Sequence, residues 1–298
     1  MRLSTDRLTV EIAEPGVFPA NTSRFDWTGF VTSIKLDGVY EFCTCEPTNL
    51  VHPSTGGVGL CNEYLCPQLC DAVKPGEKFE KFGIGLFTKP DQEGYCFYRK
   101  YEIQPFPMNW KSDRDSVTFV TEPNQSAKNS IRQEKKIRVS GQDLEMQVKI
   151  ENTGTNTLKM EEFCHNFLTL DGLKIGPDYR LDIPYIREEK VMEAGTLYGK
   201  AGQFSFRAYN EKAALLQIKK EEVNRQAQLY AWTLSHEKSP VYIRCTDEFC
   251  PAHVDIWSID HIISVETFYS IELRPGDSVS WKRRWHFGKK GENYQKDI

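Results

Sequence analysis

The chain has 298 residues, of which 39% are hydrophobic, and this composition excludes an intrinsically disordered protein. Its 38 Lys and Arg nearly balance its 42 Asp and Glu, so the net charge of −4 argues against a nucleic-acid partner. No uncharged apolar run approaches the ~18 residues of a membrane span, and the first residues lack the apolar core of a signal peptide. We therefore expect a cytoplasmic protein with no membrane partner.

The first hundred residues predict a hairpin followed by a long loop. Residues 29–36 (GFVTSIKL) and 39–45 (VYEFCTC) flank the dipeptide Asp37-Gly38, which is typical of a hairpin turn. The segment 54–85 is punctuated by Gly and Pro and shows no strand alternation. Because long loops inside compact domains are usually functional, we expect this segment to contribute to a site.

From residue 117 onward the dominant pattern is the alternation of apolar and polar residues, which predicts an antiparallel meander. The expected strands are 117–122, 131–140, 144–152, 157–170, 213–222, 227–236, 240–247, 254–260, 262–273 and 279–287. Helical periodicity with capping residues is nearly absent. We therefore expect an all-β protein in which large antiparallel sheets form a supersandwich, organised as a single domain over residues 1–298.

Nine cysteines are an odd number, which fits reduced thiols better than a fully paired disulfide framework. Five of them are close together in the sequence, namely Cys43, Cys45, Cys61, Cys66 and Cys70. Their spacing contains no C-x2-C pair of the kind that structural zinc sites use. We therefore expect no metal site, and stoichiometric zinc in the purified protein would contradict this expectation.

The stretch EEFCHNFLTL, residues 161–170, places His165 in an expected strand. Phe163 and Phe167 share its face by the period-two rule, so the imidazole is partly desolvated. A histidine in such a setting exchanges a proton near neutral pH if an acidic partner is close. The alternative is that His165 is a core side chain without a chemical role.

Three further groups of residues are site candidates. Glu266 lies in an apolar run, and a buried carboxylate requires a partner; alternatively its strand lies at an edge with the carboxylate in water. Trp257 either packs in the core or forms a stacking platform for a ring-shaped ligand. Arg24 and Asp26 in SRFDWTG form either a local ion pair or contacts to a ligand.

Three segments resemble aldose 1-epimerases and their relatives. Residues 148–172 (VKIENTGTNTLKMEEFCHNFLTLDG) resemble the strand-turn-strand in which the second strand carries a catalytic histidine, here His165. Residues 262–287 resemble the C-terminal signature, a glutamate followed by a turn and an aromatic last strand, and the glutamate is Glu266. Residues 26–38 resemble the opening hairpin of the family. The resemblance extends from about residue 8 to residue 288.

The resemblance implies the galactose mutarotase-like fold, a small carbohydrate as ligand and no cofactor. It also implies an aldose 1-epimerase-like isomerase that interconverts sugar anomers by acid-base ring opening. We expect Glu266 to take the proton of the O1 hydroxyl and His165 to donate a proton to the ring oxygen. Rotation about the bond between C1 and C2 and reclosure of the ring then give the other anomer.

The chain also departs from this family. The N-x-x-x-x-H-G-G box, which supplies a second active-site histidine, has no clean match, because His52 lies four residues before the Gly56-Gly57 pair. The same stretch resembles the G-G-x-x-x-C box of hexose-6-phosphate mutarotases, but the arginine that follows there is missing here. Glu63 and Lys89 are the expected substitutes. Two alternatives therefore stay open, a non-catalytic sugar-binding or sensing protein and a lyase or epimerase that acts on a modified sugar.

Overall fold

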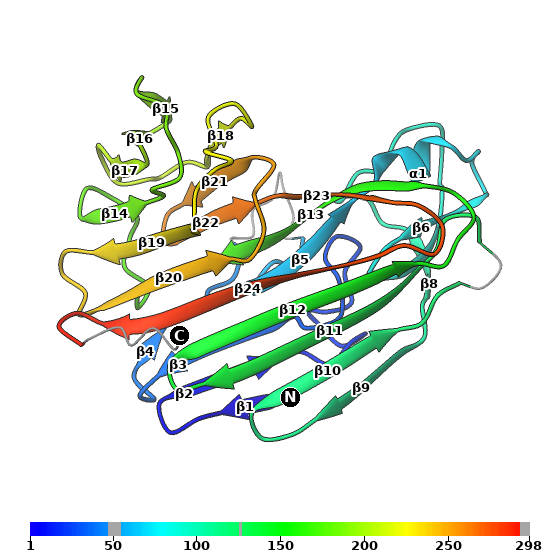
Figure 1. Cartoon of the computed structure of the whole chain (residues 1–298), viewed down its shortest axis with the longest axis horizontal. Coiled ribbons are helices and arrows are strands. Elements are labelled where there is room, and N and C mark those ends of the chain that lie inside the picture. Colours follow the sequence, from blue (N-terminus) through cyan, green and yellow to red (C-terminus); the bar gives the residue numbers. More distant parts are fainter. Residues whose placement is uncertain (47–54, 125–126, 293–298) are drawn as a thin grey trace.

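The structure is a computed structural model that describes residues 1–46, 55–124 and 127–292 of the chain. In these ranges it contains 24 β-strands and a single helix of five residues, so the all-β prediction is confirmed. The strands form two large antiparallel sheets and two small ones (Figure 1). No helix in the described ranges is long and apolar enough to cross a membrane.

The first large sheet has seven strands in the order β1-β2-β3-β5-β13-β23, and β4 pairs with β3 at the side. Strand β13 lies between β5 and β23, since β5 pairs with its second half and β23 pairs with its first half. The strands of this sheet are β1 Arg2–Ser4, β2 Leu8–Ile12, β3 Val31–Leu36, β4 Tyr40–Glu41, β5 Gly59–Leu65, β13 Leu158–Phe167 and β23 Tyr269–Leu273.

The second large sheet has eleven strands in the order β15-β16-β17-β14-β19-β20-β24-β12-β11-β10-β9. In Figure 1 its long strands β24, β12, β11 and β10 cross the front of the molecule, and the short strands β14 to β17 gather at the upper left. Its strands are β9 Met108–Ser112, β10 Ser116–Thr121, β11 Ile131–Ser140, β12 Asp143–Asn152, β14 Tyr179–Asp182, β15 Met192–Ala194, β16 Leu197–Lys200, β17 Gln203–Phe206, β19 Tyr230–His236, β20 Val241–Asp247 and β24 Ser278–Lys289.

Each small sheet has three strands. The sheet β18-β21-β22 extends the first large sheet sideways, because β22 lies beside β13 and a bridge joins Leu168 to Ile263. The sheet β6-β7-β8 follows the helix α1 along the chain. The bounds are α1 Pro67–Asp71, β6 Lys78–Lys81, β7 Gly85–Thr88, β8 Glu102–Pro105, β18 Ala214–Ile218, β21 Val254–Ile259 and β22 Ile262–Thr267.

The meander follows directly from the alternating sequence. Strand β11 buries every second residue from Ile131 to Val139 and pairs along its whole length with β12. The expected strand 262–273 differs, since it divides at Phe268 into β22 and β23. The division has a clear reason: β22 pairs with β21, whereas β23 pairs with the first half of β13.

The segment 54–85 is not the long loop that we expected, because it contains β5, α1 and β6 and ends at the start of β7. Six of the seven residues of β5 are buried, and a strand buried on both faces shows no alternation. Gly57 marks close packing instead. A Cβ atom at Gly57 would overlap the ring of Phe167 on β13.

A network of polar and charged side chains is buried between the two large sheets. Lys135 on β11 donates to Asp26 Oδ2 at 2.7 Å and to Asn62 Oδ1 at 2.8 Å. Asn62 donates to Glu162 at 2.6 Å, and Arg283 on β24 donates to the same carboxylate at 2.8 and 3.0 Å. Because each of these charges has an opposite partner, their desolvation is offset and the two sheets are held in one relative position.

Candidate active site

Strands β13 and β22 bring the two predicted catalytic residues together. The side chain of Asn166 on β13 donates to the carbonyl oxygen of Val265 on β22 at 2.6 Å, which holds the second half of β13 against β22. Asn166 follows His165 along the chain, and Val265 precedes Glu266. His165 and Glu266 therefore point to the opposite face from Asn166, and they lie beside each other there.

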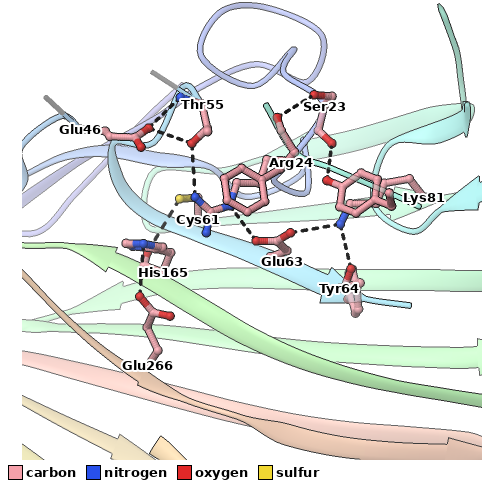
Figure 2. Close-up of polar contacts among 12 residues, drawn as sticks. Ser23, Arg24, Glu46, Thr55, Cys61, Glu63, Tyr64, Lys81, His165 and Glu266 are labelled. Carbon is pink, nitrogen blue, oxygen red and sulfur yellow. Dashed lines mark hydrogen bonds and ion pairs between the residues drawn. The ribbon is translucent and has the colours of Figure 1, made fainter. Parts of the chain in front are cut away.

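His165 and Glu266 are in direct contact. The two side chains point toward each other (Figure 2). His165 Nε2 lies 3.2 Å from Glu266 Oε1, and the side chains are only 6% and 7% exposed. The atoms are at ion-pair distance, but the contact is not an aligned hydrogen bond: within the described residues, Glu266 Oε1 and His165 Nδ1 have no hydrogen-bond partner. The carboxyl group is therefore not in water, which excludes the edge-strand alternative, and both side chains can still bond a ligand.

Burial determines the protonation state of this pair. It raises the pKa of Glu266 to about 8, and the positive charge of Arg24 opposes this rise only in part. Burial also lowers the pKa of His165 well below its usual value of 6.5, and Arg24 lowers it further. Near pH 7 the pair therefore carries one proton, which is on Glu266, and the imidazole is neutral. The imidazolium that we expected at His165 is disfavoured for this reason.

Arg24 is held beside the pair by a carboxylate and by two aromatic rings. Its Nε donates to Glu63 Oε2 at 2.9 Å, and its guanidinium lies 4.6 Å from the ring centre of Phe25 and 4.2 Å from that of Phe97. Lys81 Nζ donates to the other oxygen of Glu63 at 3.3 Å. The Glu63 carboxylate thus bridges two cations (Figure 2). The aromatic faces of Phe25 and Phe97 stabilise the guanidinium.

Three aromatic rings enclose the imidazole of His165. Phe167 stacks on it with ring centres 3.9 Å apart and 5° between the planes. Phe25 and Trp257 meet it with their edges, at 5.9 and 5.4 Å between ring centres. These rings account for the desolvation of the histidine. Trp257 itself is half-buried, so its indole packs on the site and keeps an exposed part on the same face.

Solved structures provide the comparison, since no protein-family profile and no curated protein sequence matches this chain. A galactose mutarotase related enzyme from Lactobacillus acidophilus is 13% identical, with a TM-score of 0.59 over 99% of both chains. A galactose mutarotase-like protein from Lactobacillus casei is 13% identical, with a TM-score of 0.57 over 97% of this chain and 99% of that one. An aldose epimerase homologue from C. elegans is 11% identical, with a TM-score of 0.53 over 97% and 98%.

This chain has the galactose mutarotase-like fold. The fold prediction is therefore confirmed along nearly the whole chain. Of the predicted site residues, the structure brings five together on one face of β5, β13, β21 and β22 and in the neighbouring loop. They are Arg24, Glu63, His165, Trp257 and Glu266.

Two other predicted substrate ligands lie elsewhere in this galactose mutarotase-like fold. The side chain of Asp26 is fully buried between the sheets, where Lys135 and Thr28 bond its two carboxylate oxygens. Lys89 is also buried and donates to the carbonyl oxygens of Cys70 and Val73 at 2.9 and 3.0 Å. Both side chains are occupied by internal partners, which corrects the expectation that they face a sugar. His52 lies outside the described residues.

Sequence reasoning missed two residues near the pair. Asp255 on β21 lies directly opposite Glu266 on β22. The alternation of VDIWSID already places Asp255 on the same face as Trp257, so this residue could have been found. Lys81 could not, because it and its partner Glu63 both lie in a segment whose sequence shows no strand alternation.

Metal ligation has no support in the part of the chain that the structure describes. No group of three or more His, Cys, Asp or Glu side chains is arranged there to hold an ion. All nine cysteines are free thiols. Burial raises the pKa of Cys66 and of Cys164 to about 12, so these thiols stay protonated at neutral pH.

Proposed function

We propose that this chain is a carbohydrate-active isomerase of the aldose 1-epimerase type, in which His165 and Glu266 form the acid-base pair. The observation that supports this function is the contact between the two side chains on one face of a galactose mutarotase-like fold. Proteins with this fold include a galactose mutarotase related enzyme and an aldose epimerase homologue. An acid and a base are the only groups that anomer interconversion requires.

Ring opening of a sugar hemiacetal moves two protons. The O1 hydroxyl loses a proton as its bond to C1 becomes a carbonyl, and the ring oxygen gains a proton as its bond to C1 breaks. Both oxygens are bonded to C1. A proton donor and a proton acceptor that lie side by side can therefore transfer both protons while the sugar stays in one position. At neutral pH the pair offers one of each, the protonated carboxyl group of Glu266 and the neutral imidazole of His165.

In the proposed reaction His165 takes the O1 proton while Glu266 donates its proton to the ring oxygen. Rotation about the bond between C1 and C2 precedes reclosure, in which both protons return and the other anomer forms. This assignment reverses the roles that we expected from the sequence, because burial favours the protonated carboxyl group and the neutral ring. Arg24 stabilises the carboxylate that forms on Glu266, since its charge lowers the pKa of that group.

A sugar-binding protein without turnover is the second candidate, and the burial of the pair favours it. His165 and Glu266 are only 4% and 6% exposed as whole residues. A sugar therefore reaches them only if neighbouring side chains move. A binding protein needs no such approach, because a ligand could rest on the exposed part of Trp257 alone.

Anomer interconversion measured by polarimetry or saturation-transfer NMR tests the proposal. We expect the wild type to accelerate the interconversion of at least one aldose, and Glu266→Gln and His165→Ala each to lose about 10²–10⁴-fold of that rate. Glu272→Gln on β23 is the control, because its carboxylate is 62% exposed and pairs with Lys159 at 3.3 Å rather than with either member of the acid-base pair. Full rates in both variants would overturn the assigned roles, and sugar binding without acceleration would support the second candidate.

A further inference from the structure

A cavity lies on the same face of the molecule as the acid-base pair. Its volume is about 660 Å³, and β13, β18, β21 and β23 contribute lining residues together with the loops that follow β18 and β20. Glu161, Gln217, His253, Asp255 and Ser270 are among these residues. Ligand sites typically measure about 300–1,000 Å³, so this cavity is large enough for a ligand bigger than a single hexose.

Asp255 connects the cavity to the pair. It lines the cavity and lies directly opposite Glu266, so the two carboxyl groups share one face of neighbouring strands. Asp255 is 7% exposed; its Oδ2 accepts a hydrogen bond from Gln217 at 3.2 Å, but its Oδ1 has no hydrogen-bond partner among the described residues. An unpaired buried acceptor costs free energy, which a hydroxyl group of a ligand would recover.

The lining has the chemistry of a neutral polyhydroxylated ligand. It contains three cationic and three anionic side chains, namely Lys219, Lys220, Arg225, Glu161, Glu221 and Asp255. Because these charges balance, the cavity has no excess of positive charge that would favour a phosphate or carboxylate group. Donors and acceptors are present together, as hydroxyl groups require, because each hydroxyl both donates and accepts.

An aromatic row leads from the cavity toward the pair. The ring of His253, which lines the cavity, stacks on Phe268 with ring centres 4.0 Å apart. Phe268 in turn stacks on Phe163 at 4.5 Å, and Phe163 neighbours His165 on the same face of β13. Phe163 and Phe268 are buried, so this row forms the packed wall between the cavity and the pair.

We infer that the cavity is a subsite for a second sugar residue, so that the ligand is a neutral oligosaccharide whose reducing end lies at His165 and Glu266. The position of the reducing end rests on the proposed function. Glu161 and His165 are four residues apart on the same face of β13, which corresponds to about 13 Å along a strand. This span exceeds one pyranose ring. A hydroxyl group of the second residue bonds Asp255 Oδ1.

Binding measurements test the subsite independently of turnover. Calorimetric titration compares glucose and galactose with maltose, cellobiose and lactose. We expect at least one disaccharide to bind about tenfold more tightly than its monosaccharides, and Asp255→Ala to abolish that gain. Gln217→Trp, an exchange at an exposed position of β18, should block the subsite and abolish the gain without disturbing the core. Asp182→Asn changes an exposed aspartate of β14 and is the control, which should retain the tighter binding of the disaccharide.

The possible outcomes separate this inference from the proposed function. Disaccharide binding no tighter than monosaccharide binding, or a gain that survives both variants, would overturn the subsite even if anomers interconvert. Tighter binding of glucose 6-phosphate than of every disaccharide would also overturn it. Disaccharide binding that depends on Asp255, without any anomer interconversion, would support the subsite and overturn the proposed function instead.

Discussion

The imidazole of His165 and the carboxyl group of Glu266 touch across β13 and β22, with 3.2 Å between Nε2 and Oε1. Aromatic rings enclose the imidazole, and burial of both groups leaves one proton on the pair at neutral pH. The pH dependence of rate and stability, and the substitution of neighbouring charged residues, therefore test this contact directly.

We expect the rate of anomer interconversion to fall as the pH rises above about 8. Glu266 must be protonated to donate, and its pKa is about 8. The acidic limb should lie well below pH 6.5, where the His165 imidazole becomes protonated and can no longer accept. The pH dependence of kcat/KM reports both groups in the free protein. A rate that increases through pH 8 would contradict the assignment of the donor.

Glu266→Gln should become more stable relative to the wild type as the pH rises from about 5 to about 8. The pKa of Glu266 is raised from its usual value of 4.5 to about 8 on folding, so its contribution to stability is full below the lower value and is lost as the pH rises through the higher one. The expected change is up to about 1.4 kcal/mol per pH unit. Urea unfolding of both proteins at several pH values measures it, and a difference that does not vary with pH would disprove the raised pKa.

Arg24→Gln should raise the pKa of both members of the pair, because the guanidinium lowers each of them. We expect the alkaline limb of the rate profile to move upward by about one pH unit. Histidine ring NMR should detect the corresponding rise for His165. The control is Arg99→Gln, which removes a surface arginine paired with Asp91 and should change neither titration.

Lys135→Met should lower the free energy of unfolding by about 3–5 kcal/mol, because it leaves the carboxylate of Asp26 buried without its cation. Lys136→Met changes the next residue of β11, which faces solvent, and should alter stability by less than about 0.5 kcal/mol. The double variant Asp26→Asn, Lys135→Met should recover part of the loss. Urea unfolding distinguishes these cases. If Lys135→Met were as stable as the wild type, the ion pair between Lys135 and Asp26 would not stabilise the fold.

Alternation made the meander predictable residue by residue, since the expected strand 131–140 and β11 coincide. The same rule failed for β5, because a strand that is buried on both faces has no polar face to alternate with. Glu63 on that strand was nevertheless suggested through its family resemblance. Its ion pairs with Arg24 and Lys81 were not predicted, because neither contact follows from local alternation.

The amino-acid sequence specified the all-β class, most strands of the meander and the two residues His165 and Glu266, because strand periodicity and sequence motifs are local properties of a chain. It could not specify that β22 lies beside the second half of β13, that Asp26 pairs with Lys135 rather than with Arg24, or that the shared proton lies on the carboxyl group. These features depend on which strands become neighbours and on how completely the site is desolvated. Both are consequences of long-range packing, which local alternation does not encode.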